Sequence, residues 1–199
     1  MTRKILEARM VWNNYQLTNQ QSITRELYLR LIGDVIRVPW KCLMFNTTTR
    51  PKAVFIMWLQ LQAKLLTKDR LLKWGSNVEP QCMLCQNEDE TRDHLFVKCS
   101  YTRCLWDGLA SWMQMSFDIG GNWQQHLTWV MKNAKGKTIR AQIFRMVYVE
   151  VVYAVWIERN QRVFEQRTKG VDRIIRTIAF ICNVKASSKT RPLVQSWLV

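Results

Sequence analysis

The stretch from residue 82 to residue 99 constrains this chain more than any other part of it. Cys82 and Cys85 are separated by two residues, and His94 and Cys99, which follow, are separated by four. Three thiolates and one imidazole form a complete tetrahedral ligand set for Zn2+, and a structural zinc site leaves no position open for water or substrate. The spacing therefore predicts one Zn2+ held by Cys82, Cys85, His94 and Cys99. Cys104 is the rival to Cys99 as the last ligand.

The remaining cysteines and the apolar stretches indicate a reducing compartment. Cys42, Cys104 and Cys182 stand apart from the cluster, and the first residues contain no apolar run of the kind that a secretory leader needs. The apolar stretch 143–157 contains Arg145 and Glu150, so we expect no membrane span. We expect an intracellular protein of the nucleus or cytoplasm.

The motifs around the cluster resemble those of a known family. Residues 51–106 contain, in order, Pro-Lys-Ala-Val-Phe-Ile-Met-Trp-Leu, Leu-Leu-Thr-Lys-Asp-Arg-Leu, Cys-x2-Cys, Glu-Thr-x2-His-Leu-Phe and Cys-x6-Trp. Residues 155–160 add Val-Trp-Ile-Glu-Arg-Asn, followed by Val163 and Phe164. Over about residues 35–167 the chain resembles the zinc-binding domain that follows the reverse transcriptase in plant non-LTR (LINE-type) retrotransposon polyproteins. The resemblance implies a non-catalytic module that helps to handle nucleic acid during retrotransposition.

The composition predicts a mostly α-helical fold. Ten Trp, nine Met and 48% hydrophobic residues provide a packed core, whereas seven Gly and four Pro are few for a turn-rich β fold. We therefore expect a helical domain stapled by the single Cys3His zinc site, with a C-terminal helical extension. The expected segments are an N-terminal arm and helix (1–34), a zinc-binding helical module (35–118) and a basic helical extension (119–199), with Gly120-Gly121 near the last boundary.

Caps and apolar spacing predict where the helices lie. Ser22 can cap a helix that ends near residue 32, and residues 34–46 should form a single turn or a short strand. Further helices are expected over 51–66, 67–75, from Ser100, from Asn122, over 138–166 and over 172–185. The tail, residues 187–199, is predicted to be mobile.

The positive charge of the chain lies mainly in its C-terminal third. Thirty Lys and Arg against 15 Asp and Glu give +15, of which residues 119–199 supply 14 basic and four acidic side chains, or +10. The stretch around the cysteines is net acidic and has Phe96 as its only aromatic residue, unlike zinc knuckles that bind single strands. We therefore interpret the metal as structural. The candidate nucleic-acid-binding residues are Arg159, Arg162, Lys169, Arg173 and Arg176, although cations near a helix end can also simply be solvated.

No pattern in the sequence supports catalysis. The chain has no polymerase-type carboxylate pair, no phosphate-binding glycine loop and, besides His94, a single histidine. That residue, His126, falls in an amphipathic stretch, where an ordinary partly buried side chain is expected. We expect neither an enzyme nor a small-molecule substrate.

Two functions are compatible with these features. The first is a zinc-binding module of a retrotransposon polyprotein that binds nucleic acid, RNA or DNA, with low sequence specificity. The alternative is a protein-interaction or self-association scaffold with purely structural zinc. Salt-sensitive binding to nucleic acid would distinguish the first from the second.

Overall fold

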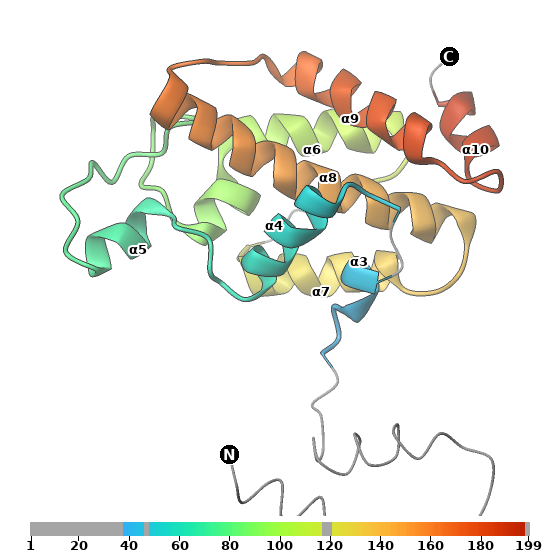
Figure 1. The fold of residues 1–199 in the computed structure, drawn as a ribbon, viewed down its shortest axis with the longest axis horizontal. Coiled ribbons are helices and arrows are strands. Elements are labelled where there is room, and N and C mark those ends of the chain that lie inside the picture. Colours follow the sequence, from blue (N-terminus) through green and yellow to red (C-terminus); the bar gives the residue numbers. More distant parts are fainter. Residues whose placement is uncertain (1–37, 46–47, 117–120, 198–199) are drawn as a thin grey trace, which may run out of the picture. The chain divides into compact units, whose positions relative to one another are not determined.

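The residues that the structure describes form helices joined by loops. The structure is a computed structural model and describes residues 38–45, 48–116 and 121–197 (Figure 1). In these ranges its elements are α3 (Lys41–Phe45), α4 (Pro51–Leu61), α5 (Lys68–Lys73), the π-helical turn η1 (His94–Lys98), α6 (Ser100–Trp112), α7 (Trp123–Ala134), α8 (Ile139–Asn160), the π-helical turn η2 (Gln161–Glu165), α9 (Val171–Lys185) and α10 (Arg191–Ser196). The described ranges contain no strand, only an isolated antiparallel bridge between Gln81 and Asp89. The predicted mostly α-helical fold is confirmed.

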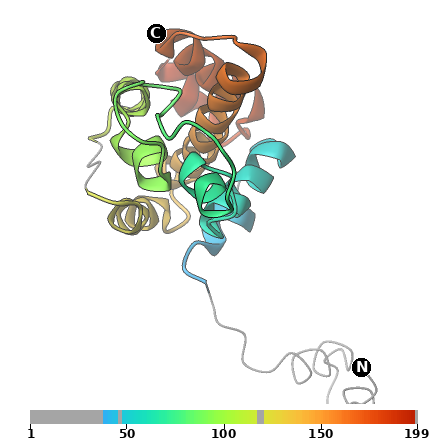
Figure 2. The same ribbon diagram turned by 90° about the vertical axis from the view of Figure 1, so that its left-hand side faces the viewer.

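Helix α8 lies at the centre of the fold. The hydroxyl of Thr138 caps it by accepting from the backbone N–H of Ala141 at 3.2 Å. Most of its residues are buried because α3, α4, α7 and α9 all pack against it. Figure 2 shows α8 between α4 and α7. A helix that is apolar on most sides is stable in water only when neighbours cover it in this way.

Large aromatic side chains fill the space between α6, α7 and α8. Trp106 of α6 stacks on Tyr148 of α8 with ring centroids 5.4 Å apart, and its indole N–H donates to the carbonyl of Phe96 at 3.2 Å. His126 of α7 lies among these rings and is 1% exposed. The sequence predicts a partly buried His126, whereas in the structure this side chain is fully buried in the core.

Most predicted helix starts agree with the structure, and one helix end does not. Pro51 occupies the first turn of α4, and Asn122 and Gln125 form a reciprocal capping box at the start of α7. The helix predicted over 51–66, however, ends at Leu61. Ala63 has a φ of 53°, a left-handed conformation that interrupts the helix before the apolar run is over.

The predicted mobile tail contains a helix instead. Residues Arg191–Ser196 form α10, which packs against α9. Val194 is 0% exposed and Trp197 is 9% exposed, and the Trp197 ring meets Trp112 edge to face at 5.5 Å. The prediction of a mobile tail was wrong because burial of these two side chains compensates the entropy lost on ordering the segment.

Several predictions fall on residues outside the described ranges. These are the N-terminal arm and helix of residues 1–34, which include the helix from Ser22, and the boundary between residues 118 and 119. Helix α4 precedes that boundary and α8 follows it, and these two helices pack against each other. Among the described residues, no helix combines the length and the apolar character needed to cross a bilayer.

Candidate metal centre and basic face

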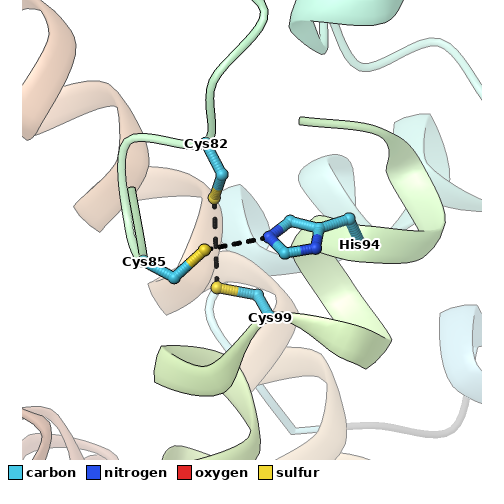
Figure 3. Close-up of side chains that lie close together, drawn as sticks. All are labelled: Cys82, Cys85, His94 and Cys99. Carbon is cyan, nitrogen blue, oxygen red and sulfur yellow. Dashed lines mark hydrogen bonds between the residues drawn. The ribbon is translucent and has the colours of Figure 1, made fainter. Parts of the chain in front are cut away.

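Four side chains from two consecutive segments converge on one point (Figure 3). Cys82 and Cys85 come from the loop after α5, where the N–H of Gln86 donates to the carbonyl of Cys82 at 2.9 Å and closes a tight turn. His94 begins η1, and Cys99 lies between η1 and α6. The candidate ligand atoms of the four residues all lie within 4.8 Å of one another.

The π-helical turn η1 explains how His94 and Cys99 reach the same point. Residues five apart in an α-helix lie about 140° apart around the axis. In η1 the N–H of Cys99 donates instead to the carbonyl of His94, five residues earlier, at 2.7 Å. This wider turn reduces the angular offset, so both side chains can face the Cys82–Cys85 turn.

The dimensions of the cluster suit Zn2+. The sulfurs of Cys82 and Cys99 are 3.9 Å apart, and Cys85 Sγ is 3.2 Å from His94 Nε2. In a tetrahedral site with Zn–S of about 2.3 Å and Zn–N of about 2.0 Å, two sulfurs lie about 3.8 Å apart, and a sulfur and a nitrogen about 3.5 Å apart. Zinc with four protein ligands would supply structural stability and would have no open position for a substrate.

The surroundings of the cluster prepare its ligands for a cation. His94 directs Nδ1 toward Glu88 Oε2 at 3.2 Å, so a carboxylate orients the ring and leaves Nε2 for the metal. The hydrogen bond between the sulfurs of Cys82 and Cys99, together with burial, raises the pKa of Cys82 to about 12, while the same hydrogen bond lowers the pKa of Cys99. Zinc binds thiolates, so metal binding has to release the thiol protons of this pair.

Cys104 lies outside the cluster. Its side chain is exposed on α6, whereas Cys99 is buried beside the other ligands. The geometry thus favours Cys99 over Cys104 as the fourth ligand.

A buried ion pair attaches the metal loop, defined as residues 82–93, to α8. Glu90 of the loop and Arg159 of α8 are 0% and 4% exposed in their side chains, with the closest N···O distance at 2.8 Å. Glu90 also accepts from the backbone N–H of Lys68 at 3.0 Å. The carboxylate is therefore held from both α5 and α8, and it fixes the loop to the core.

Arg162 makes a second attachment of the metal loop. Its guanidinium donates to the carbonyls of Met83 and Leu84 at 3.2 and 2.9 Å, in the turn between the two cysteines. It also pairs with Glu158 at 2.8 Å. Glu158 in turn accepts from the backbone N–H of Lys169 at 2.9 Å, just before α9.

The five predicted nucleic-acid-binding residues therefore occupy different environments. Arg159 is buried and Arg162 is largely covered, and both hold the metal loop. Lys169 is half-buried and donates through Nζ to Gln161 at 2.7 Å. Only Arg173 and Arg176 are exposed, on one face of α9.

Phe180 joins these two arginines and was not identified from the sequence. A surface hollow is lined by Arg173, Arg176, Thr177 and Phe180, and the Phe180 side chain is 64% exposed. The signal was present in the sequence, since residues three and four apart share a helix face. We call these four residues the α9 face.

Comparison with known families supports the metal centre. Residues 22–106 match the model of a family described as zinc-binding in reverse transcriptase. The matched range contains all four cluster residues, so this part of the chain is a zinc-binding module of the reverse-transcriptase type. The motif at residues 155–160 lies beyond the match. Neither a curated protein nor a solved structure matches the chain.

Proposed function

We propose that this chain is a non-catalytic accessory module of a LINE-type retrotransposon polyprotein and that it binds nucleic acid with little sequence preference through the α9 face. In this proposal zinc holds the metal loop in place and makes no contact with nucleic acid. The observation that carries the proposal is the exposure of Arg173, Arg176 and Phe180 on one face of a helix.

The chemistry of the α9 face suits a single strand. Guanidinium groups bind phosphates, and an exposed aromatic ring stacks on a base whatever its identity. None of the arginine and phenylalanine side chains of this face is buried, so they are available without a rearrangement of the core. The metal loop is less suited, because its carboxylates repel phosphates and two of its backbone carbonyls already hold Arg162.

The absence of a catalytic role is part of the proposal. Burial lowers the pKa of His126 to about 4, and in the described residues neither ring nitrogen has a hydrogen-bond partner. A histidine held neutral among tryptophan and tyrosine rings has no access to a substrate proton. With four protein ligands on a zinc ion, the metal centre also offers no catalytic position.

A charge-reversal experiment tests the α9 face. The zinc-loaded chain and its Arg173→Glu, Arg176→Glu double variant are titrated into a fluorescein-labelled 20-nucleotide single strand, and anisotropy is followed from 50 to 300 mM salt. Each phosphate contact contributes about 0.7 to the logarithmic salt slope on single strands, so the double variant should bind more weakly with a slope flatter by about 1.4. Phe180→Ala should cost about 1–3 kcal/mol of affinity if the ring stacks on a base.

A matched control separates this face from the net charge of the chain. Lys135 and Lys137 are exposed in the loop between α7 and α8, and their double change to Glu alters the net charge by the same amount. Binding of that control should fall much less. Equal losses in the two double variants would contradict the assignment to the α9 face.

The alternative scaffold function is supported by exposed apolar side chains in the zinc module. Phe55, Leu72 and Trp74 are 57%, 41% and 63% exposed. If the chain sediments with a mass that increases with concentration and shows no salt-dependent binding to nucleic acid, the scaffold function replaces the proposed one.

A further inference from the structure

A cavity in the zinc module has the features of an anion site. Its lining residues lie between Gln60 and Arg92, and none of them belongs to α9. It has a volume of about 330 Å³, within the lower range of small-ligand pockets. It lies between the end of α4, the turn at residues 62–67, α5 and the metal loop. Its polar lining consists of Gln60, Thr67, Asp69, Arg70, Lys73 and Arg92.

Two hydrogen-bond donors of this lining have no partner among the described residues. One is the side-chain amide nitrogen of Gln60, a residue that is 1% exposed. The other is Nε of Arg92, whose terminal nitrogen donates to the backbone carbonyl of Gln60 at 2.9 Å. A buried donor without a partner is unfavourable by about 1–3 kcal/mol, so a ligand that accepts from both would remove this penalty.

The charges around the cavity favour an anion. Arg70, Lys73 and Arg92 supply three cations, and Asp69 is the one carboxylate of the lining. The Asp69 carboxylate accepts from the hydroxyl of Thr67 at 2.5 Å. Arg70 also donates to the carbonyl of Leu65 at 3.1 Å, which anchors its guanidinium beside the turn. The lining thus has a net charge of +2, which matches a phosphate dianion.

From this geometry we propose that the cavity binds a phosphate group. The amide of Gln60 and Nε of Arg92 donate to its oxygens, and Arg70 and Lys73 neutralise its charge. The unprotonated oxygens of a phosphate group accept hydrogen bonds, as these unpartnered donors require. The site does not depend on the α9 face, so it can exist whether or not that face binds nucleic acid.

Nuclear magnetic resonance on the zinc-loaded chain tests the site with inorganic phosphate as the probe. The side-chain NH2 signals of Gln60 and the Nε–H signal of Arg92 are followed during a phosphate titration at constant ionic strength. Both should shift and saturate. Shifts that grow linearly and equal those produced by chloride would overturn the proposal.

Variants distinguish this site from general attraction of anions. Gln60→Leu removes a hydrogen bond to a charged ligand and should weaken phosphate binding about tenfold or more. Lys73→Gln, at an exposed position, should weaken it about two- to fivefold. Lys52→Gln on α4 removes an exposed cation that does not line the cavity and should leave binding unchanged. The proposal fails if Lys52→Gln and Lys73→Gln have the same effect, or if Gln60→Leu has none.

Two oligonucleotides of one sequence identify the source of the phosphate. They carry either a 5′-phosphate or a 5′-hydroxyl, and they are added to the variant in which Arg173 and Arg176 are reversed in charge. A Gln60 shift with both oligonucleotides supports the site and assigns it to internal phosphodiesters. A shift with the 5′-phosphate alone supports it and assigns it to a strand end or a free nucleotide. A shift with neither, despite a response to inorganic phosphate, supports a site for small phosphates.

Discussion

Replacing Arg159 by Met should destabilise the chain far more than removing a surface cation. The substitution leaves the Glu90 carboxylate, which is 0% exposed, without its counter-ion. Three N–H···O contacts of 2.8–3.1 Å join the two side chains, and the N–H of Lys68 at 3.0 Å is the remaining donor to that carboxylate. Breaking a buried ion pair by removing one partner costs about 3–5 kcal/mol, and we expect the free energy of unfolding to fall by that amount.

A second substitution separates the charge effect from lost packing. Glu90→Gln keeps an oxygen for the N–H of Lys68 and removes the negative charge. In combination with Arg159→Met it should therefore restore stability to within about 2 kcal/mol of the parent chain. Urea unfolding of the zinc-loaded proteins, followed by tryptophan fluorescence, measures both values. Arg176→Met, at an exposed position of α9, serves as the control and should change stability by about 0.5 kcal/mol or less.

The double variant also supplies the result that would refute this reasoning. If it is as unstable as Arg159→Met alone, the loss comes from packing around α8 and not from a lone buried charge.

Further predictions concern His126 and the metal site. Burial lowers the pKa of His126 from 6.5 to about 4, so as the pH falls the unfolded chain is protonated at His126 before the folded chain is. The stability that comes from the neutral, buried His126 is therefore complete above about pH 6.5. It falls by about 3 kcal/mol as the pH decreases to 4. His126→Phe should remove that part of the pH dependence, and parallel urea midpoints for the two proteins from pH 7 to 4 would contradict the assignment. Cys99→Ser should abolish stoichiometric zinc binding in a colorimetric zinc assay, whereas Cys104→Ser should retain it; the reverse outcome would make Cys104 the ligand. Chelation of zinc should speed hydrogen exchange in the metal loop more than in the first half of α8, and uniform exchange would show that the site and the helix unfold together.

Features set by neighbouring residues could be predicted from the sequence. The cysteine and histidine spacing limits which side chains can meet, and the structure brings together Cys82, Cys85, His94 and Cys99. Caps also act locally, so Asn122 and Thr138 identified the starts of α7 and α8.

Features set by distant contacts could not be predicted. Arg159 looks like one more cation of a basic segment, and only the fold reveals that Glu90, 69 residues earlier, buries and neutralises it. The order of α10 likewise depends on Trp197 meeting Trp112, a contact between residues far apart in sequence. The early end of α4 depends on a left-handed Ala63, a conformation that alanine rarely adopts and that no local signal indicates.

The contacts of Arg162 connect the metal loop to the start of α9. Arg162 holds the carbonyls of Met83 and Leu84 and pairs with Glu158, and Glu158 holds the N–H of Lys169. Occupancy of the cysteine cluster and the position of α9 thus act on one shared set of contacts. Thermodynamic linkage makes such a coupling reciprocal. If bound zinc changes the affinity of the proposed α9 face for a strand by some factor, a bound strand changes the affinity of the cluster for zinc by the same factor. If zinc strengthens the proposed binding of a strand to α9, a saturating strand would raise the affinity of the cluster for zinc by the same factor.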